Sequence, residues 1–200
     1  FDETVEVHIR TGLNVRRLAW EQDGLKIEAE DVELAWRPLF LFGGTVKLDR
    51  VHASALRITD RRPPSNEPWK LPDALVIRLA VELDDLRITQ VEWITNKAIR
   101  AEDLAGRYWF DGATHGLRLD NVRWAGGSYR ATANLGARGP LPLDATISGK
   151  VEAPVPGRAS SLPVEFTATL KGPLADLQAQ AQVTTTDAVA KATQATASAR

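Results

Sequence analysis

The sequence predicts an all-β protein built on an elongated, curved and mostly antiparallel sheet, with one short helical turn near residues 38–42. Two observations carry this prediction. Apolar and polar residues alternate along much of the 200-residue chain, and this period of two is typical of strands with one buried and one solvated face. A short apolar motif also recurs, and its spacing indicates that the strands bend at regular places.

Alternation is strictest over residues 75–83, where Arg78 and Glu82 fix which side chains face water. This stretch predicts a strand with its large apolar side chains on one buried face. The expected buried side chains are Leu75, Ile77, Leu79, Val81 and Leu83, opposite Val76, Arg78, Ala80 and Glu82. Alternation over 25–29, 32–36, 117–119, 129–135, 147–151 and 166–170 predicts further strands.

A second pattern is superimposed on the first: an apolar residue, two mostly polar residues, an apolar residue, any residue and another apolar residue. It occurs at 15–20, 29–34, 48–53, 83–88, 88–93 and 119–124. The additional residue breaks the period of two once in each unit. A β-bulge has this effect, because it inserts one residue and returns the following side chains to the same face. We therefore expect bent strands that keep one face apolar.

Turn residues separate the apolar stretches, as at Asp23-Gly24 and Gly126-Gly127. Between two expected strands, Pro38 suits the start of a helix and Gly43-Gly44 its end, so residues 38–42 are expected to form a single turn. Its side chains are too apolar to stand free in water, and we expect them to plug an end of the sheet. They are Leu39, Phe40, Leu41 and Phe42.

Residues 1–200 are expected to be a single segment of a longer protein. Within it, 60–68 is expected to be a polar loop and 154–163 a proline-rich break. The tail over 184–200 is poorly defined, and its alternation of Ala with polar residues favours a strand.

Charge and composition exclude several classes of protein. The 25 basic and 26 acidic side chains nearly cancel, which gives no basic footprint for nucleic acid. The absence of cysteine excludes disulfides, thiolate metal sites and cysteine nucleophiles. No apolar stretch approaches the roughly 20 residues of a membrane-spanning helix, so any membrane anchor is expected outside this chain.

The titratable residues do not predict an enzyme, a metal site or a cofactor. His8, His52 and His115 each stand alone, without a second ligand at metal-binding spacing. The acidic pairs at 30–31, 84–85 and 102–103 are adjacent, and neighbours on a strand point to opposite faces, so they cannot work together as acid and base. A Gly-x-Ser-x-Gly nucleophile motif is also missing from the sequence. We therefore expect a non-enzymatic protein.

The tryptophans are the side chains most open to a binding role: Trp20, Trp36, Trp69, Trp93, Trp109 and Trp124. Stacking on sugars or bases requires them to be exposed on one face beside polar groups. Four of them close or extend the repeated apolar motif, where a large side chain completes the buried face of a strand. The sequence leaves two roles open for the tryptophans: filling a core and lining a groove.

The succession of these elements resembles the N-terminal region of TamB-like proteins in the AsmA-like family. The resemblance rests on Leu34-Ala35-Trp36-Arg37-Pro38-Leu39 with a glycine-ended turn, a strand over 48–58, and Pro68-Trp69-Lys70-Leu71-Pro72. Gly139-Pro140-Leu141-Pro142-Leu143 and the segment 170–177 are also similar to recurrent elements of that family. The matching elements extend over residues 12–183.

The resemblance implies a periplasmic segment of a protein anchored in the inner membrane of Gram-negative bacteria. It implies an open, U-shaped β-groove with a hydrophobic lining, phospholipid as the bound partner, and a role in outer-membrane biogenesis. A barrel partner of the TamA type would bind through regions outside this chain. The family has no cofactor, and the resemblance adds none.

The residues fit this expectation, because a sheet with one apolar face must cover it with a second layer or a ligand, and the sequence has no long amphipathic helix. Two alternatives stay open: a chaperone module that offers strand edges to outer-membrane barrel proteins, and a carbohydrate-binding β-sandwich, favoured if the tryptophans are exposed. The expected lipid-binding side chains are Leu25, Ile27, Val32, Leu34, Leu75, Ile77, Leu79, Val81, Leu83, Leu86, Ile88, Leu117, Leu119 and Val122.

Overall fold

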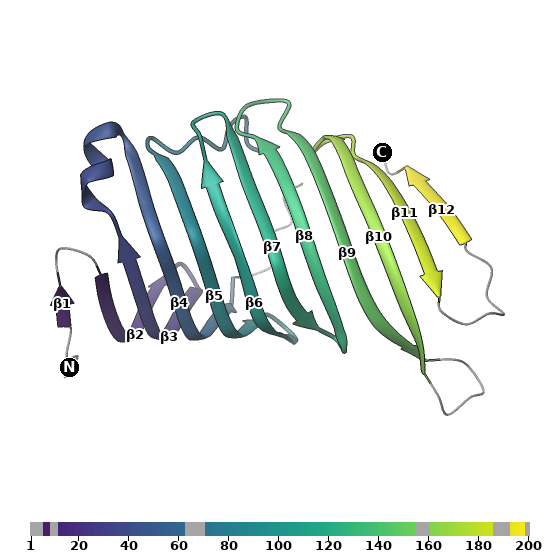
Figure 1. Ribbon diagram of the computed structural model, residues 1–200, viewed down its shortest axis with the longest axis horizontal. Helices are drawn as coiled ribbons and strands as arrows, with labels where there is room; N and C mark the ends of the chain where they lie inside the picture. The colour runs from purple at the N-terminus through teal and green to yellow at the C-terminus, as the bar shows by residue number, and fades with distance from the viewer. Residues whose placement is uncertain (1–5, 9–11, 63–70, 155–160, 186–192, 199–200) are drawn as a thin grey trace.

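The computed structural model describes residues 6–8, 12–62, 71–154, 161–185 and 193–198. These residues form one sheet in which the strands lie side by side in chain order from β1 to β12 (Figure 1). The first and last strands do not pair with each other, so the sheet is open. The predicted all-β architecture, with a curved and mostly antiparallel sheet, is confirmed.

The elements are β1 (Glu6–His8), β2 (Gly12–Gln22), β3 (Leu25–Trp36), the 3-10 turn η1 (Pro38–Gly43), β4 (Thr45–Asp60), β5 (Ala80–Ile94), β6 (Ala98–Phe110), β7 (Thr114–Trp124), β8 (Gly127–Gly136), β9 (Pro142–Pro154), β10 (Ser161–Pro173), β11 (Gln178–Thr185) and β12 (Thr193–Ser198). The expected loop at 60–68 and break at 154–163 fall largely outside the described residues. In the expected tail, 193–198 pairs with β11 as a strand.

The strands bend where the motif predicted bulges. The pairing register shifts between Leu83 and Leu86 against β6, and between Leu119 and Val122 against β8. Asp31 and Asp103 occupy the left-handed region, with φ of 48° and 52°, which short side chains that bond locally tolerate best. The inserted residue therefore bends each strand while the apolar side chains before and after it stay on one face.

The helical turn is also confirmed. Pro38 begins η1, and Gly44 ends it in a left-handed conformation with φ of 77°. The Gly44 N–H donates to the Leu41 carbonyl at 3.0 Å, as expected for a glycine that closes a helix end. The side chains of this turn are exposed. The expectation that they plug an end of the sheet is therefore wrong for this structure, because no described residue covers them.

One predicted strand begins later than expected. Val81 and Leu83 are half-buried with Glu82 exposed between them, as predicted, but β5 starts only at Ala80. The register prediction is therefore wrong for Leu75, Ile77 and Leu79, which are exposed and lie outside any strand. The reason is topological. β4 and β5 are parallel, so the chain must travel back along the length of the sheet between them, and the alternating stretch belongs to that connection.

The core of this sheet is small. Among the described residues, the buried apolar side chains are Ala29, Phe110, Ala137, Leu141 and Ala145. Phe110 is the largest of these side chains and has 1% of its surface exposed. Its ring stacks on that of His115 with the centroids 4.4 Å apart. Most other apolar side chains are half-buried, because nothing among the described residues forms a second layer over them.

We expect Phe110→Ala to lower the free energy of unfolding by about 3 kcal/mol, because it empties the most buried large side chain of a small core. The matched variant Phe42→Ala removes the same ring from a fully exposed site and should change stability by less than about 0.5 kcal/mol. Urea unfolding followed by tryptophan fluorescence measures both values. Equal losses of stability in the two variants would contradict the conclusion that Phe110 belongs to the buried core.

Candidate functional site

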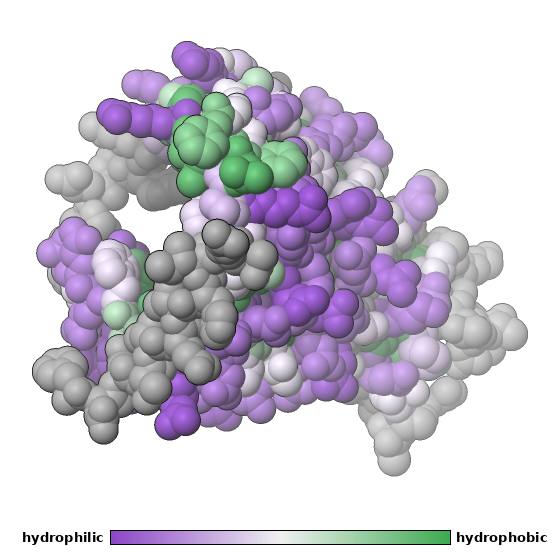
Figure 2. Space-filling view, turned by 60° about the vertical axis from the view of Figure 1, so that its left-hand side comes forward, coloured by the Kyte–Doolittle hydropathy of each residue, from purple (hydrophilic) through white to green (hydrophobic). Residues whose placement is uncertain are grey.

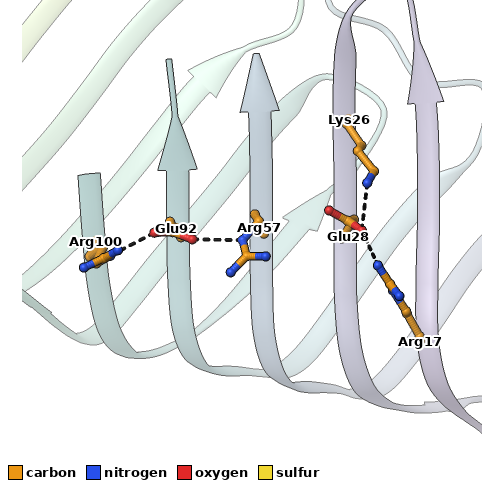
Figure 3. Close-up of polar contacts among 6 residues, drawn as sticks. All are labelled: Arg17, Lys26, Glu28, Arg57, Glu92 and Arg100. Atoms are coloured by element: carbon orange, nitrogen blue, oxygen red, sulfur yellow. Dashed lines mark hydrogen bonds and ion pairs between the residues drawn. The ribbon is translucent and has the colours of Figure 1, made fainter. Parts of the chain in front are cut away.

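The side chains of the sheet divide into a charged face and an apolar face. On the charged face, the Arg17 guanidinium lies 2.6 Å and the Lys26 ammonium 3.0 Å from the Glu28 carboxylate (Figure 3). On neighbouring strands of the same face, the guanidinium groups of Arg57 and Arg100 lie 2.9 and 2.8 Å from the Glu92 carboxylate. We call these six residues the charged ladder. The surface turned to the viewer in Figure 2 is largely hydrophilic. We call the charged face the outer face of the sheet and the apolar face its inner face.

The arginines of the charged ladder lower the pKa of its carboxylates. Hydrogen bonds from Arg100 and Arg57 lower the pKa of Glu92, and those from Arg17 and Lys26 lower the pKa of Glu28. Open depressions between these long side chains include one of about 400 Å³ lined by Arg17, Glu28, Arg57, Glu92 and Arg100 among others. Paired charges line it, so it suits water and ions rather than apolar groups.

The apolar face consists of rows of side chains that run across the strands. One row joins residues in register from β2 to β11 without a polar or charged side chain. At a strand spacing of about 4.8 Å, this row is about 40 Å long. We call it the apolar row. Its members are Leu13, Leu34, Val51, Leu86, Gly106, Leu119, Ala131, Ile147, Ala168 and Ala181.

Parallel rows extend the apolar face on either side. Toward the η1 end of the strands, Trp36, Leu48, Leu83, Tyr108 and Leu117 lie in register. Toward the other end, a row on β2 to β6 contains large side chains that are about half exposed, with Trp93 and Ile99 at 50%. That row is Trp20, Ile27, Ile58, Trp93 and Ile99. The apolar face is therefore continuous along and across the sheet.

A short segment crosses this face. The Leu75 N–H donates to the Ala137 carbonyl at 2.8 Å, and the Gly139 N–H donates to the Asp73 carbonyl at 2.9 Å. His115, which shares the apolar face with Phe110, donates from Nε2 to the Leu75 carbonyl at 2.6 Å. We call residues 71–79 the strap. The strap therefore lies on the apolar, inner face of the trough, beside the buried residues Phe110 and Ala137.

Both ring nitrogens of His115 are hydrogen-bonded, and Nε2 is the one that holds the strap. A carbonyl only accepts, so Nε2 carries the proton that bonds the Leu75 carbonyl. The other ring nitrogen, Nδ1, forms a hydrogen bond of 2.7 Å with the Tyr108 hydroxyl. Burial raises the pKa of Tyr108, which keeps this hydroxyl protonated. Spacing along the chain gave no sign of this arrangement, because His115 and Leu75 are forty residues apart.

The predicted lining residues fall into two groups. Leu75, Ile77 and Leu79 lie on the strap rather than on a strand. The others lie on the strands with their apolar neighbours on the inner face and are half-buried; they are Leu25, Ile27, Val32, Leu34, Val81, Leu83, Leu86, Ile88, Leu117, Leu119 and Val122. Sequence reasoning missed several members of the apolar row. Ala131, Ile147 and Ala168 lie in stretches whose alternation was recognised, whereas Leu13, Val51 and Ala181 were not singled out as lining residues; aligning all of them across the strands needs the register.

The tryptophans do not form one cluster. Trp20, Trp93 and Trp124 are about half exposed on the inner face. Trp109 points to the outer face and covers Gly116, where an added Cβ would lie 1.8 Å from its ring. Trp69 lies outside the described residues. The inner tryptophans are thus positioned to line a trough, and Trp109 packs on the backbone outside it.

The adjacent carboxylates at 84–85 are bound to different partners. Asp84 bonds Lys47, and Asp85 turns the other way to His52 at 2.9 Å, so the two carboxylates do not converge. Partial burial raises the pKa of Asp85, but hydrogen bonds from His52 and Arg87 outweigh it and leave the pKa lowered. No group of three metal-ligating side chains occurs among the described residues.

Protonation of Glu92 should weaken the charged ladder. Its pKa is lowered in the folded state, so its contribution to stability is present above the unfolded pKa and is lost as the pH falls through the folded value. We expect the free energy of unfolding, measured by urea titration, to fall between about pH 5 and pH 3. Glu92→Gln should reduce the size of that fall, whereas Glu21→Gln, outside the ladder, should leave it unchanged. Identical pH profiles for both variants would refute a role for Glu92.

Comparison with known proteins adds no identification to this geometry. None of the helices in the described residues is long and apolar enough to cross a membrane. No family model, no curated protein and no solved structure matches the chain.

Proposed function

We propose that the chain binds phospholipid acyl chains along its inner face and acts as a segment of a lipid-conducting β-groove. The observation that supports this proposal best is the apolar row, which runs from β2 to β11 with its side chains half-buried and, among the described residues, without a covering layer. A folded protein that exposes such a face in water needs a partner for it. A flexible chain of methylene groups fits a long and open apolar surface.

The energetics favour weakly specific binding. Each CH₂ transferred from water to an apolar surface contributes roughly 0.8 kcal/mol, so an acyl chain is held by its length rather than by particular contacts. The trough offers aliphatic and small side chains with few polar groups to fix one ligand position. A lipid can therefore shift along the apolar row, which at about 40 Å exceeds the thickness of the roughly 30 Å bilayer core.

The sequence resemblance supports a location for this activity. In the proposal, the segment lies in the periplasm, conducts phospholipid between inner and outer membranes, and supports outer-membrane biogenesis. The inner-membrane anchor and the contact with a TamA-type barrel protein belong to regions outside this chain. The charged ladder suits such a setting, because it keeps the outer side of the trough solvated while the inner side carries the lipid.

One alternative has an observation in its favour. The sheet is open, so β2 presents backbone groups beyond its three register pairs with β1, and unfolded barrel strands are able to add to such an edge. This chaperone role uses the edge rather than the inner face. A carbohydrate-binding β-sandwich has less support, since the described residues build one sheet and not two packed sheets.

A charge placed on the inner face should remove lipid without unfolding the protein. We expect Ile88→Asp to lower co-purified phospholipid, measured by mass spectrometry, by about tenfold, because the new carboxylate stays hydrated in the lipid path. The loss of thermal stability should be small, since water reaches a half-exposed site. Ala131→Asp on the apolar row should act in the same way.

Thr132→Asp is the matched control, because Thr132 is the next residue on β8 and its side chain is on the outer face in register with Arg118. This variant should retain both lipid and fold. Folded inner-face variants with undiminished lipid would rule out binding at this face and would favour the edge alternative. Unfolding of both inner-face variants would point to a closed core instead of a trough.

A further inference from the structure

The η1 turn carries the most exposed apolar side chains in the described part of the chain. Phe42 is 92% and Leu39 76% exposed, with Phe40 and Leu41 exposed beside them. In Figure 2 a hydrophobic patch stands out at the upper end of a hydrophilic surface, at the place of η1 in Figure 1. We call residues 38–44 the apolar tip. It joins β3 to β4 and protrudes at the end of the sheet.

Backbone hydrogen bonds fix the apolar tip in this exposed form. The Phe40 N–H donates to the Arg37 carbonyl at 3.2 Å, and the Gly44 N–H to the Leu41 carbonyl at 3.0 Å. The Gly44 carbonyl accepts from the Ala80 N–H at 3.0 Å, which ties the tip to β5. These bonds satisfy backbone groups internally, as an apolar environment requires.

The charged side chains next to the tip form ion pairs with residues outside it. Arg37 is paired with Asp49 at 2.8 Å, and Lys47 with Glu82 and Asp84 at 2.7 and 2.8 Å. From Pro38 to Val46 the sequence contains no charged residue. The tip is thus an uncharged, protruding turn, and the charged residues beside it are ion-paired.

We propose that the apolar tip inserts into the interfacial region of a phospholipid bilayer. A convex knob whose side chains are exposed in several directions suits a fluid apolar phase, which surrounds it, better than a protein surface, which covers one side. This inference depends on the proposed function, because insertion of the tip would serve the lipid conduction proposed for the trough. The residues flanking the tip, Trp36 and Val46, are in register with inner-face residues Leu48 and Val81, so the tip leads directly into the trough.

A single-cysteine label tests the insertion, because the chain has no cysteine of its own. The full chain carrying Phe42→Cys is labelled with an environment-sensitive fluorophore and mixed with vesicles of phosphatidylethanolamine and phosphatidylglycerol. We expect a blue shift and quenching by brominated lipids. The control label at Asn96→Cys, in the turn at the opposite end of β5, should show neither change. Equal signals at both positions, or a blue shift at 42 without vesicles, would overturn insertion; the latter would indicate a second copy as the occupant.

A pair of variants separates membrane docking from lipid binding. Leu39→Asp combined with Phe42→Asp should reduce flotation with vesicles by about tenfold while melting is unchanged, because both side chains are exposed. Co-purified phospholipid in the trough should persist. Ile88→Asp should show the reverse: vesicle flotation retained and trough lipid lost. Undiminished flotation of the tip variant would overturn docking through η1, and undiminished lipid in Ile88→Asp would overturn only the function of the trough.

Discussion

The constraint on which this structure depends is the strict alternation of side chains along a strand. A strand that bends by inserting one residue exchanges its two faces unless a bulge absorbs that residue. Asp31 and Asp103 do so in a left-handed conformation, and the register shifts at Leu83–Leu86 and Leu119–Val122 have the same effect. The sheet can therefore curve into a trough while Leu, Val, Ile and Ala side chains remain on its inner side from end to end.

An open trough changes what stabilises the fold. In an ordinary domain of this size a packed core supplies most of the favourable free energy, whereas here Phe110 and Leu141 are the large side chains among the described residues that are almost fully buried. Backbone pairing between successive strands and half-buried contacts along the rows must carry more of the stability. The strap supplies local cover: through Leu75 and His115 it closes one part of the inner face and leaves the rest open.

The two faces have complementary roles in the proposed function. The charged ladder keeps the outside soluble and pairs its charges across adjacent strands, at a small gain in stability for each exposed pair. The inner face offers length and continuity instead of specific contacts. At one end of the sheet the apolar tip presents Leu39 and Phe42 beyond the last ion pairs, so the protein exposes apolar groups in two places, and a lipid phase is able to cover both.

The sequence alone determined the local features: the period of two, the bulge motif and the turn at Pro38–Gly44. Each depends on residues close together in the chain, where propensity and spacing act directly. It also identified most of the half-buried side chains of the inner face, such as Leu86 and Leu119. The tertiary structure decided which of these side chains align across strands, because register depends on pairing between distant segments.

The connection between β4 and β5 shows why the rest could not be predicted. Residues 75–79 alternate as a strand does, but the parallel pairing of β4 with β5 assigns them to the strap, and hydrophobic periodicity does not distinguish a strand from an extended crossover. The pairing of His115 with Leu75, across forty positions, arises from the same topology. Sequence determined which residues prefer an apolar surface; only the fold decided which surface that is, because long-range pairing sets the direction in which the chain returns.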